Sequence, residues 1–307
     1  MDDDLPDFEH SELIELPPAI SDADFLRNRQ LRPENTEIAN AELLCHSGDV
    51  SGATADITRL LQTGTHVQRL HFCLLGAVLS GSEELVRLLL GVGLPVSMDN
   101  VKPAIKQKSL PMLSLFLQHG WNINEEEAWC VPSLPSCAVA TDPDESLISW
   151  FLNGADPNAK CEMDITLLST AAGYAPLPIV KQLFEHCPLG TSFRGQLLHW
   201  AAGRTSDDAE DVVQLVLERC RPDLNKIQYN DEPFSYEIRK VVGLGTALHE
   251  AARRGHPGIV HMLICKGTDV SIRDSSGNTA LEVAELYENH AAVALLQNAE
   301  KVSLAKI

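Results

Sequence analysis

A period of 33 residues in the C-terminal part of the chain constrains the fold more than any other feature. The tripeptide Thr-Ala-Leu at 246–248 returns at 279–281, and Leu263 returns as Leu296. Matching residue types at a fixed period of this length indicate a row of similar structural units rather than one globular core. In such a row each unit contacts only its neighbours, so a chain of 307 residues does not have to divide into ordinary globular domains.

Each predicted unit is a pair of short helices. In the best-defined unit, Leu248, Ala251 and Ala252 share one face of a first helix, which ends at Gly255. A second helix over 257–266 begins with proline, carries an apolar stripe and stops before a glycine. Neither helix can bury its apolar face alone, so neighbouring units must stack and share a continuous core.

The same segment resembles an ankyrin repeat. The resemblance rests on Leu-His-Glu-Ala-Ala at 248–252, Gly-His at 255–256, Ile-Val at 259–260 and Gly-Thr-Asp-Val at 267–270. Copies of differing quality extend over about 38–298. The resemblance implies an all-α solenoid of about eight helix–turn–helix units, with short β-turn or hairpin fingers between them.

Changes in composition and spacing divide the chain. Residues 1–35 are acidic, and we expect them to be partly disordered, with a capping helix over 21–31. Residues 36–300 form the predicted array, and 301–307 form a polar tail. Because the spacing between the sixth and seventh units is about 13 residues too long, we expect an extended loop insertion over 226–245.

The charge balance excludes several classes of partner. The chain has 24 basic and 43 acidic residues, which gives a formal net charge of −19. A general binder of nucleic acids or anionic membranes would need a basic surface, so we expect neither as a partner. The eight cysteines are scattered, without the close pairs typical of metal sites. We therefore expect no metal and no cofactor, reduced thiols, and a monomer located in the cytoplasm or nucleus.

Residues that suggest catalysis have structural interpretations. The resemblance assigns His199 and His249 to the motif histidine, which in ankyrin repeats bridges the backbones of turns. His256 and His261 are five residues apart, whereas two ligands on one helix face need a spacing of three or four. The sequence has no phosphate-binding loop, nucleophile elbow or zinc-protease motif. We therefore predict that the chain is not an enzyme and name no catalytic residue.

The functional prediction depends on the concave face that the resemblance implies. In ankyrin arrays, partners contact the loop tips before each first helix and the exposed end of that helix. The positions carried over by phase are Arg69, His71, Lys106, Trp129, Met163, Tyr174, Phe193, Arg204, Arg253, Arg254 and Arg273. Because arginine and aromatic residues are enriched at binding hot spots, we predict a scaffold, adaptor or regulatory protein that binds an acidic, partly apolar peptide or domain surface. In the competing interpretation, the arginines are solvated and offset acids on neighbouring helices.

Two further functions stay open. The acidic tail or surface could inhibit a basic partner, and binding would then weaken as salt is added. Alternatively, an enzyme or small-molecule binder would use a pocket between the concave helices and the 226–245 loop, where Tyr229, Tyr236, Glu250 and Arg253 are the first residues to test. A deep pocket with a buried acid, or a histidine with an open nitrogen, would favour this alternative, and a shallow groove would not.

Overall fold

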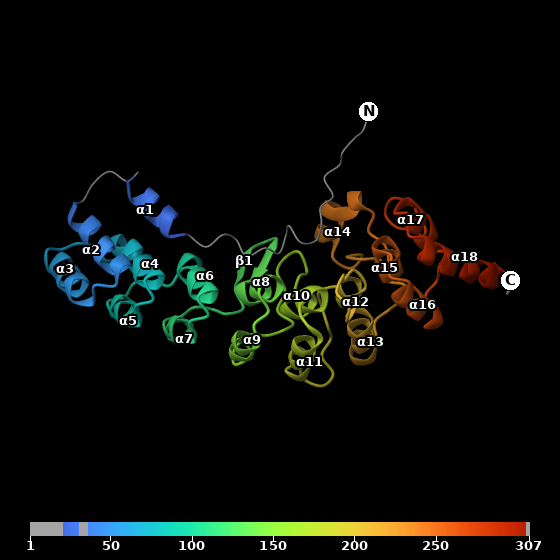
Figure 1. Cartoon of the computed structure of the whole chain (residues 1–307), viewed down its shortest axis with the longest axis horizontal. Helices are drawn as coiled ribbons and strands as arrows, with labels where there is room; N and C mark the ends of the chain where they lie inside the picture. The colour runs from blue at the N-terminus through green and yellow to red at the C-terminus, as the bar shows by residue number, and fades with distance from the viewer. Residues whose placement is uncertain (1–20, 31–35, 305–307) are drawn as a thin grey trace, which may run out of the picture. The chain divides into compact units, whose positions relative to one another are not determined.

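The computed structural model describes residues 21–30 and 36–304, and these are almost entirely helical (Figure 1). Within this part of the chain the only sheet is a hairpin of two short strands. Paired helices repeat along the chain, which confirms the predicted all-α array. The described residues divide at Asn124 into two compact units. The parts of the predicted acidic segment and tail at 1–20 and 305–307 lie outside the described residues.

The first unit holds three helix pairs. Its elements are α1 (Asp22–Gln30), α2 (Thr36–Ser47), α3 (Val50–Gln62), η2 (Val67–Leu70), α4 (His71–Leu79), α5 (Glu83–Gly91), α6 (Met98–Lys106) and α7 (Leu110–Gln118). The first helices of the pairs, α2, α4 and α6, pack side by side, and α3, α5 and α7 form a second row beside them (Figure 1). Helix α1 packs through Phe25, whose buried ring stacks on His46 with the ring centroids 4.7 Å apart.

Local sequence signals account for these helices and for how closely they pack. Helix α5 begins after Ser82, whose hydroxyl accepts a hydrogen bond from the Leu85 backbone N–H, and it buries Leu85 and Leu89 on one face. Helices α2 and α4 approach each other at Gly76, where an added Cβ would lie 3.1 Å from the backbone nitrogen of His46. A glycine at this position therefore sets the distance between the two helices.

The turn between α6 and α7 uses a lysine where three other units have a glycine with positive φ, at Gly48, Gly81 and Gly255. Lys108 at this position predicts an irregular turn, but the turn is regular. Lys108 adopts a left-handed φ of 54°, and its N–H donates to the Ile105 carbonyl at 2.8 Å. The glycine turn at Gly81 has the same conformation, with φ of 75° and a bond of 3.0 Å from its N–H to the Val78 carbonyl. The hydrogen bonds of the turn thus hold a lysine in a left-handed backbone conformation that residues other than glycine rarely adopt.

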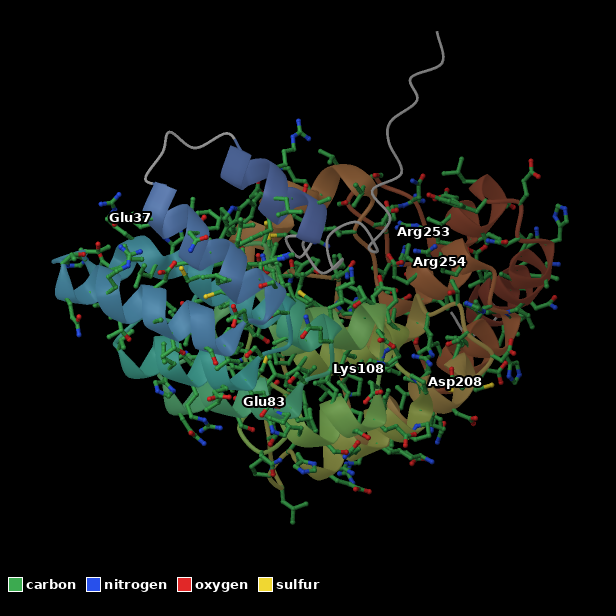
Figure 2. All side chains as sticks on the ribbon, turned by 60° about the vertical axis from the view of Figure 1, so that its left-hand side comes forward. Glu37, Glu83, Lys108, Asp208, Arg253 and Arg254 are labelled. Carbon is green, nitrogen blue, oxygen red and sulfur yellow. The ribbon has the colours of Figure 1, made fainter. Side chains whose placement is uncertain are left out.

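Replacing Lys108 by glycine is expected to give a more stable protein than replacing it by alanine. Relative to Lys108→Ala, which also removes the side chain, Lys108→Gly relieves the left-handed strain and gains about 1 kcal/mol in the free energy of unfolding. Urea unfolding of the two variants measures this difference (the position is labelled in Figure 2). Equal stability of the glycine and alanine variants would contradict the prediction.

The second unit holds five helix pairs, the hairpin and an inserted segment. Its elements are β1 (Glu126–Ala128), β2 (Val131–Ser133), α8 (Leu134–Thr141), α9 (Glu145–Phe151), α10 (Leu167–Tyr174), α11 (Leu177–Glu185), α12 (Leu197–Ala202), α13 (Ala209–Cys220), α14 (Pro233–Arg239), η3 (Lys240–Val242), α15 (Ala247–Arg254), α16 (Pro257–Cys265), α17 (Ala280–Leu286) and α18 (His290–Leu304). Within this unit, helices α8, α10, α12, α15 and α17 form one row, while α11, α13, α16 and α18 form a second row beside it (Figure 1).

Asparagine side chains tie successive turns of the second unit together. The Asn124 side-chain oxygen accepts the Asp156 backbone N–H at 2.7 Å, one unit further along the chain. Asn158 accepts the Arg194 N–H in the same way at 2.9 Å. The side-chain oxygen of Asn225 likewise accepts a backbone N–H of the following repeat. These bonds satisfy backbone N–H groups that have no hydrogen-bond partner within a helix. They also fix the register of the stack.

The 226–245 segment, predicted as an extended loop, contains a helix. Pro233 occupies the first turn of α14, where its fixed φ and missing N–H are tolerated. The ends of the segment are held together, since the Gln228 N–H donates to the Gly245 carbonyl at 2.9 Å. The insertion is therefore a structured addition to the stack and presents α14 on the surface of the second unit.

Candidate binding surface

Helix α14 is attached to the stack through polar groups. The Ser235 hydroxyl donates to the carbonyl of Glu162 at 3.3 Å, in a turn 73 residues earlier in the chain. Arg239 donates to the hydroxyl of Tyr229 at 3.3 Å, and its guanidinium lies 5.3 Å from the centroid of that ring. Ser235, Arg239 and Tyr229 are all buried. The buried face of α14 is thus built from a hydroxyl and a guanidinium.

The opposite face of α14 is apolar and open to solvent. Phe234 and Ile238, four residues apart on the helix, are 52% and 45% exposed, and Val241 in η3 is 77% exposed. Trp129, at the hairpin tip, meets Phe234 edge to face with the ring centroids 5.6 Å apart. We call Trp129, Phe234, Ile238, Val241 and Val242 the α14 surface. A surface helix normally buries its apolar face, so this reversed orientation makes the α14 surface a candidate contact site.

The predicted arginines do not form one open groove. Arg204 is only 2% exposed, because its guanidinium is bound to the Asp208 carboxylate inside the stack. It was predicted as a partner contact, and that role is wrong for a side chain this deeply buried. The same correction applies to Met163, which is also 2% exposed, because its side chain belongs to the core.

The remaining arginines of the second unit differ in how they are engaged. Arg253 and Arg254 are neighbours at the end of α15 (Figure 2). Arg253 pairs with Glu250 at 3.3 Å and donates to the Gly243 carbonyl at 2.9 Å. Arg273 pairs with Glu282 at 2.9 Å. Arg254 is exposed and forms no ion pair within residues 21–30 and 36–304. Most of these cations therefore offset acids of the same chain, as the competing interpretation expected.

The other predicted contact residues are dispersed. Tyr174 is partly buried against Trp200, with the ring centroids 6.0 Å apart, and Phe193 packs against Phe184 at 5.4 Å. Trp129 is the predicted aromatic residue that joins the α14 surface. The positions assigned to the first unit are all exposed, and they are Arg69, His71 and Lys106. The sequence prediction missed the rest of the α14 surface, although Phe234, Ile238 and Val241 follow a helical stripe that could have signalled it.

The motif histidines bridge turns, as the resemblance implied. His199 Nε2 lies 3.1 Å from the carbonyl oxygen of Lys226, and His249 Nε2 lies 3.2 Å from that of Asn278. Burial lowers the pKa of His199 to about 4, so this imidazole is neutral at neutral pH. Among the residues that the structure describes, no group of three or more His, Cys, Asp or Glu side chains is placed to hold a metal ion.

A pocket of about 420 Å³ lies beside the start of the insertion. Its lining includes Asp164, Gln196, His199, Lys226 and Glu232. Burial raises the pKa of Asp164, yet its carboxylate is engaged by the Gln196 side-chain amide at 2.6 Å. The buried acid and the histidine of this pocket thus take part in structural hydrogen bonds.

Comparisons with known proteins agree with the fold. Residues 198–305 match a family model described as ankyrin repeats, in three copies. A search of curated proteins finds no significant match to the chain. In the described part of the chain, no helix combines the length and apolar character that crossing a bilayer requires.

Proposed function

This chain is an ankyrin-repeat protein, and on that basis we propose that it binds a protein partner through the α14 surface, as an adaptor or a regulatory protein. Ankyrin repeats are in general protein–protein interaction modules. The observation that carries the proposal is the outward-facing apolar side of α14, where Phe234 is 52% and Val241 77% exposed. Burying the exposed part of each such side chain contributes roughly 1 kcal/mol to binding.

The proposal changes the chemistry of the partner predicted from the sequence. An acidic partner was expected because arginines were assigned to the concave face. Arg204 is buried, and Arg253 and Arg273 are paired with carboxylates of the same chain, so Arg254 is the one predicted arginine of the described second unit that is exposed without an ion pair. Trp129 belongs both to the predicted concave-face residues and to the α14 surface. The proposed contact therefore includes Trp129 from the sequence prediction, and otherwise consists of apolar side chains that the prediction did not name.

The test is quantitative affinity purification with a matched pair of variants. Phe234→Ser with Val241→Ser removes two apolar side chains from the α14 surface and is expected to reduce recovery of the partner about tenfold. The control, Leu189→Ser with Val302→Ser, removes two exposed apolar side chains elsewhere, at 101% and 56% exposure. All four positions are exposed, so both variants should keep the stability of the wild type.

The outcomes separate the possible contact sites. Loss of a partner from the first variant but not from the control supports the α14 surface. Equal recovery by both variants would show that the partner binds elsewhere. An additional Arg254→Glu variant tests the remaining exposed arginine of α15, because partner loss confined to that variant would restore the acidic-partner prediction.

A further inference from the structure

Exposed carboxylates lie beside the hairpin end of the α14 surface. Glu125 and Glu126 lie four and three residues before Trp129, at the start of the hairpin, and both are exposed. Glu126 accepts the backbone N–H of Glu162 at 3.1 Å, and the Glu162 carbonyl in turn accepts the Ser235 hydroxyl of α14. The Glu162 residue is also exposed. We call Glu125, Glu126 and Glu162 the acidic rim.

Cations near α14 do not neutralise the acidic rim. Lys160 is paired with Glu232, Lys226 with Asp231 at 2.8 Å, and Lys240 with Glu237 at 2.7 Å. Arg239 lies on the buried face of α14, with its guanidinium directed at Tyr229. Within residues 124–304, none of the three carboxylates of the acidic rim forms an ion pair. An apolar contact surface is thus bordered by negative charge that this unit leaves unpaired.

We propose that the partner of the α14 surface is a polypeptide segment whose apolar side chains are flanked by lysine or arginine residues. This inference rests on the proposed function and adds the charge of the partner. The apolar side chains of the segment would cover Phe234, Ile238 and Val241, and its basic residues would lie against the acidic rim. The same rim repels nucleic acids and anionic membranes, so the basic polypeptide is the class of partner that the charges favour.

A random-peptide phage library panned on the full chain tests the charge directly. Peptides are selected on the wild type and counter-selected on Phe234→Ser with Val241→Ser, so that retained sequences depend on the α14 surface. We expect these sequences to combine apolar residues with a net positive charge. Retained sequences that are acidic or uncharged would overturn the proposal while leaving the α14 surface intact as a contact site.

A second measurement examines the acidic rim itself. A selected peptide is synthesised, and its affinity is measured for the wild type and for Glu125→Gln with Glu126→Gln and Glu162→Gln. The side-chain oxygen of glutamine preserves an acceptor for the backbone bond at position 126. We expect about a tenfold loss of affinity in this variant, with weakening of wild-type binding as salt is added. Unchanged affinity would overturn the basic-partner inference, and a library without α14-dependent peptides would overturn the proposed function together with it.

Discussion

Replacing Arg204 by methionine is expected to lower the free energy of unfolding by about 2–3 kcal/mol, because it removes the charge-assisted hydrogen bonds of a buried side chain. The side chain of Arg204 is 1% exposed. Its Nε and Nη2 donate to Asp208 Oδ1 at 2.8 and 2.6 Å, and Nη1 donates to the Ala172 carbonyl at 3.3 Å. Methionine fills similar volume but supplies none of these donors.

The pair between Arg204 and Asp208 holds both helices of the preceding repeat. Arg204 caps carbonyl groups near the C-terminus of α10, while Asp208 Oδ2 accepts the Leu177 N–H at 2.9 Å at the start of α11. Burial alone would raise the pKa of Asp208. The hydrogen bonds from Arg204, Ser206 and Leu177 outweigh that influence, and the pKa lies below its ordinary value. The substitution should therefore loosen the contact between two repeats as well as one side chain.

Arg254→Met is the matched control, because Arg254 is exposed and lies on the same row of helices. Its free energy of unfolding should stay within about 0.5 kcal/mol of the wild type. Urea unfolding followed by circular dichroism measures both variants. If Arg204→Met were as stable as Arg254→Met, the bonds of Arg204 to Asp208 would have no structural importance.

The repeat fold was predictable because its signals are local and recur. Leu248, Ala251 and Ala252 lie on one face of a short helix, and all three are buried where α15 packs on its neighbours. Gly255 ends that helix with φ of 70°, a conformation that glycine adopts without strain. Such features need only the residues of one unit, and the 33-residue period then copies them along the chain.

The orientation of α14 was not predictable, because it depends on a contact between distant parts of the chain. The apolar stripe of α14 alone predicts that Phe234 and Ile238 face a core. The apolar side of the helix faces solvent instead, because Ser235 donates a hydrogen bond to the Glu162 carbonyl and Arg239 donates one to Tyr229. Ser235 and Glu162 are 73 residues apart, and a contact over that separation leaves no repeating pattern in a single sequence.

The predicted arginine groove failed for a related reason. The positions of Arg204, Arg253 and Arg273 within the repeat period predicted that they lie near the loop tips. Those positions did not predict which acidic side chains would pair with them. Asp208 and Glu250 lie within one helical turn of Arg204 and Arg253 in the sequence. The competing interpretation, in which solvated arginines offset acids on neighbouring helices, agrees with the pairing of these charges but not with the position of the acids, which are close in sequence to their arginines.

Acidification from pH 7 to 5 is expected to destabilise the protein by about 2 kcal/mol through His199 alone. Burial is the largest influence on this imidazole, and it lowers the pKa to about 4 despite the nearby Glu250 carboxylate, which favours the charged form. The unfolded chain has an ordinary histidine pKa of about 6.5, so between these values it binds more protons than the folded chain. Stability is therefore fully present above pH 6.5 and falls as the pH approaches 4, by at most about 1.4 kcal/mol per pH unit for this group.

Burial also lowers the pKa of His249, so its contribution has the same sign. The decisive comparison is His199→Asn, which loses the bond to the Lys226 carbonyl at every pH but no longer titrates. We expect the stability difference between wild type and His199→Asn to shrink by about 2 kcal/mol between pH 7 and 5, whereas Arg254→Met, which leaves His199 in place, follows the wild-type profile. A constant difference would mean that His199 takes up a proton in the folded state.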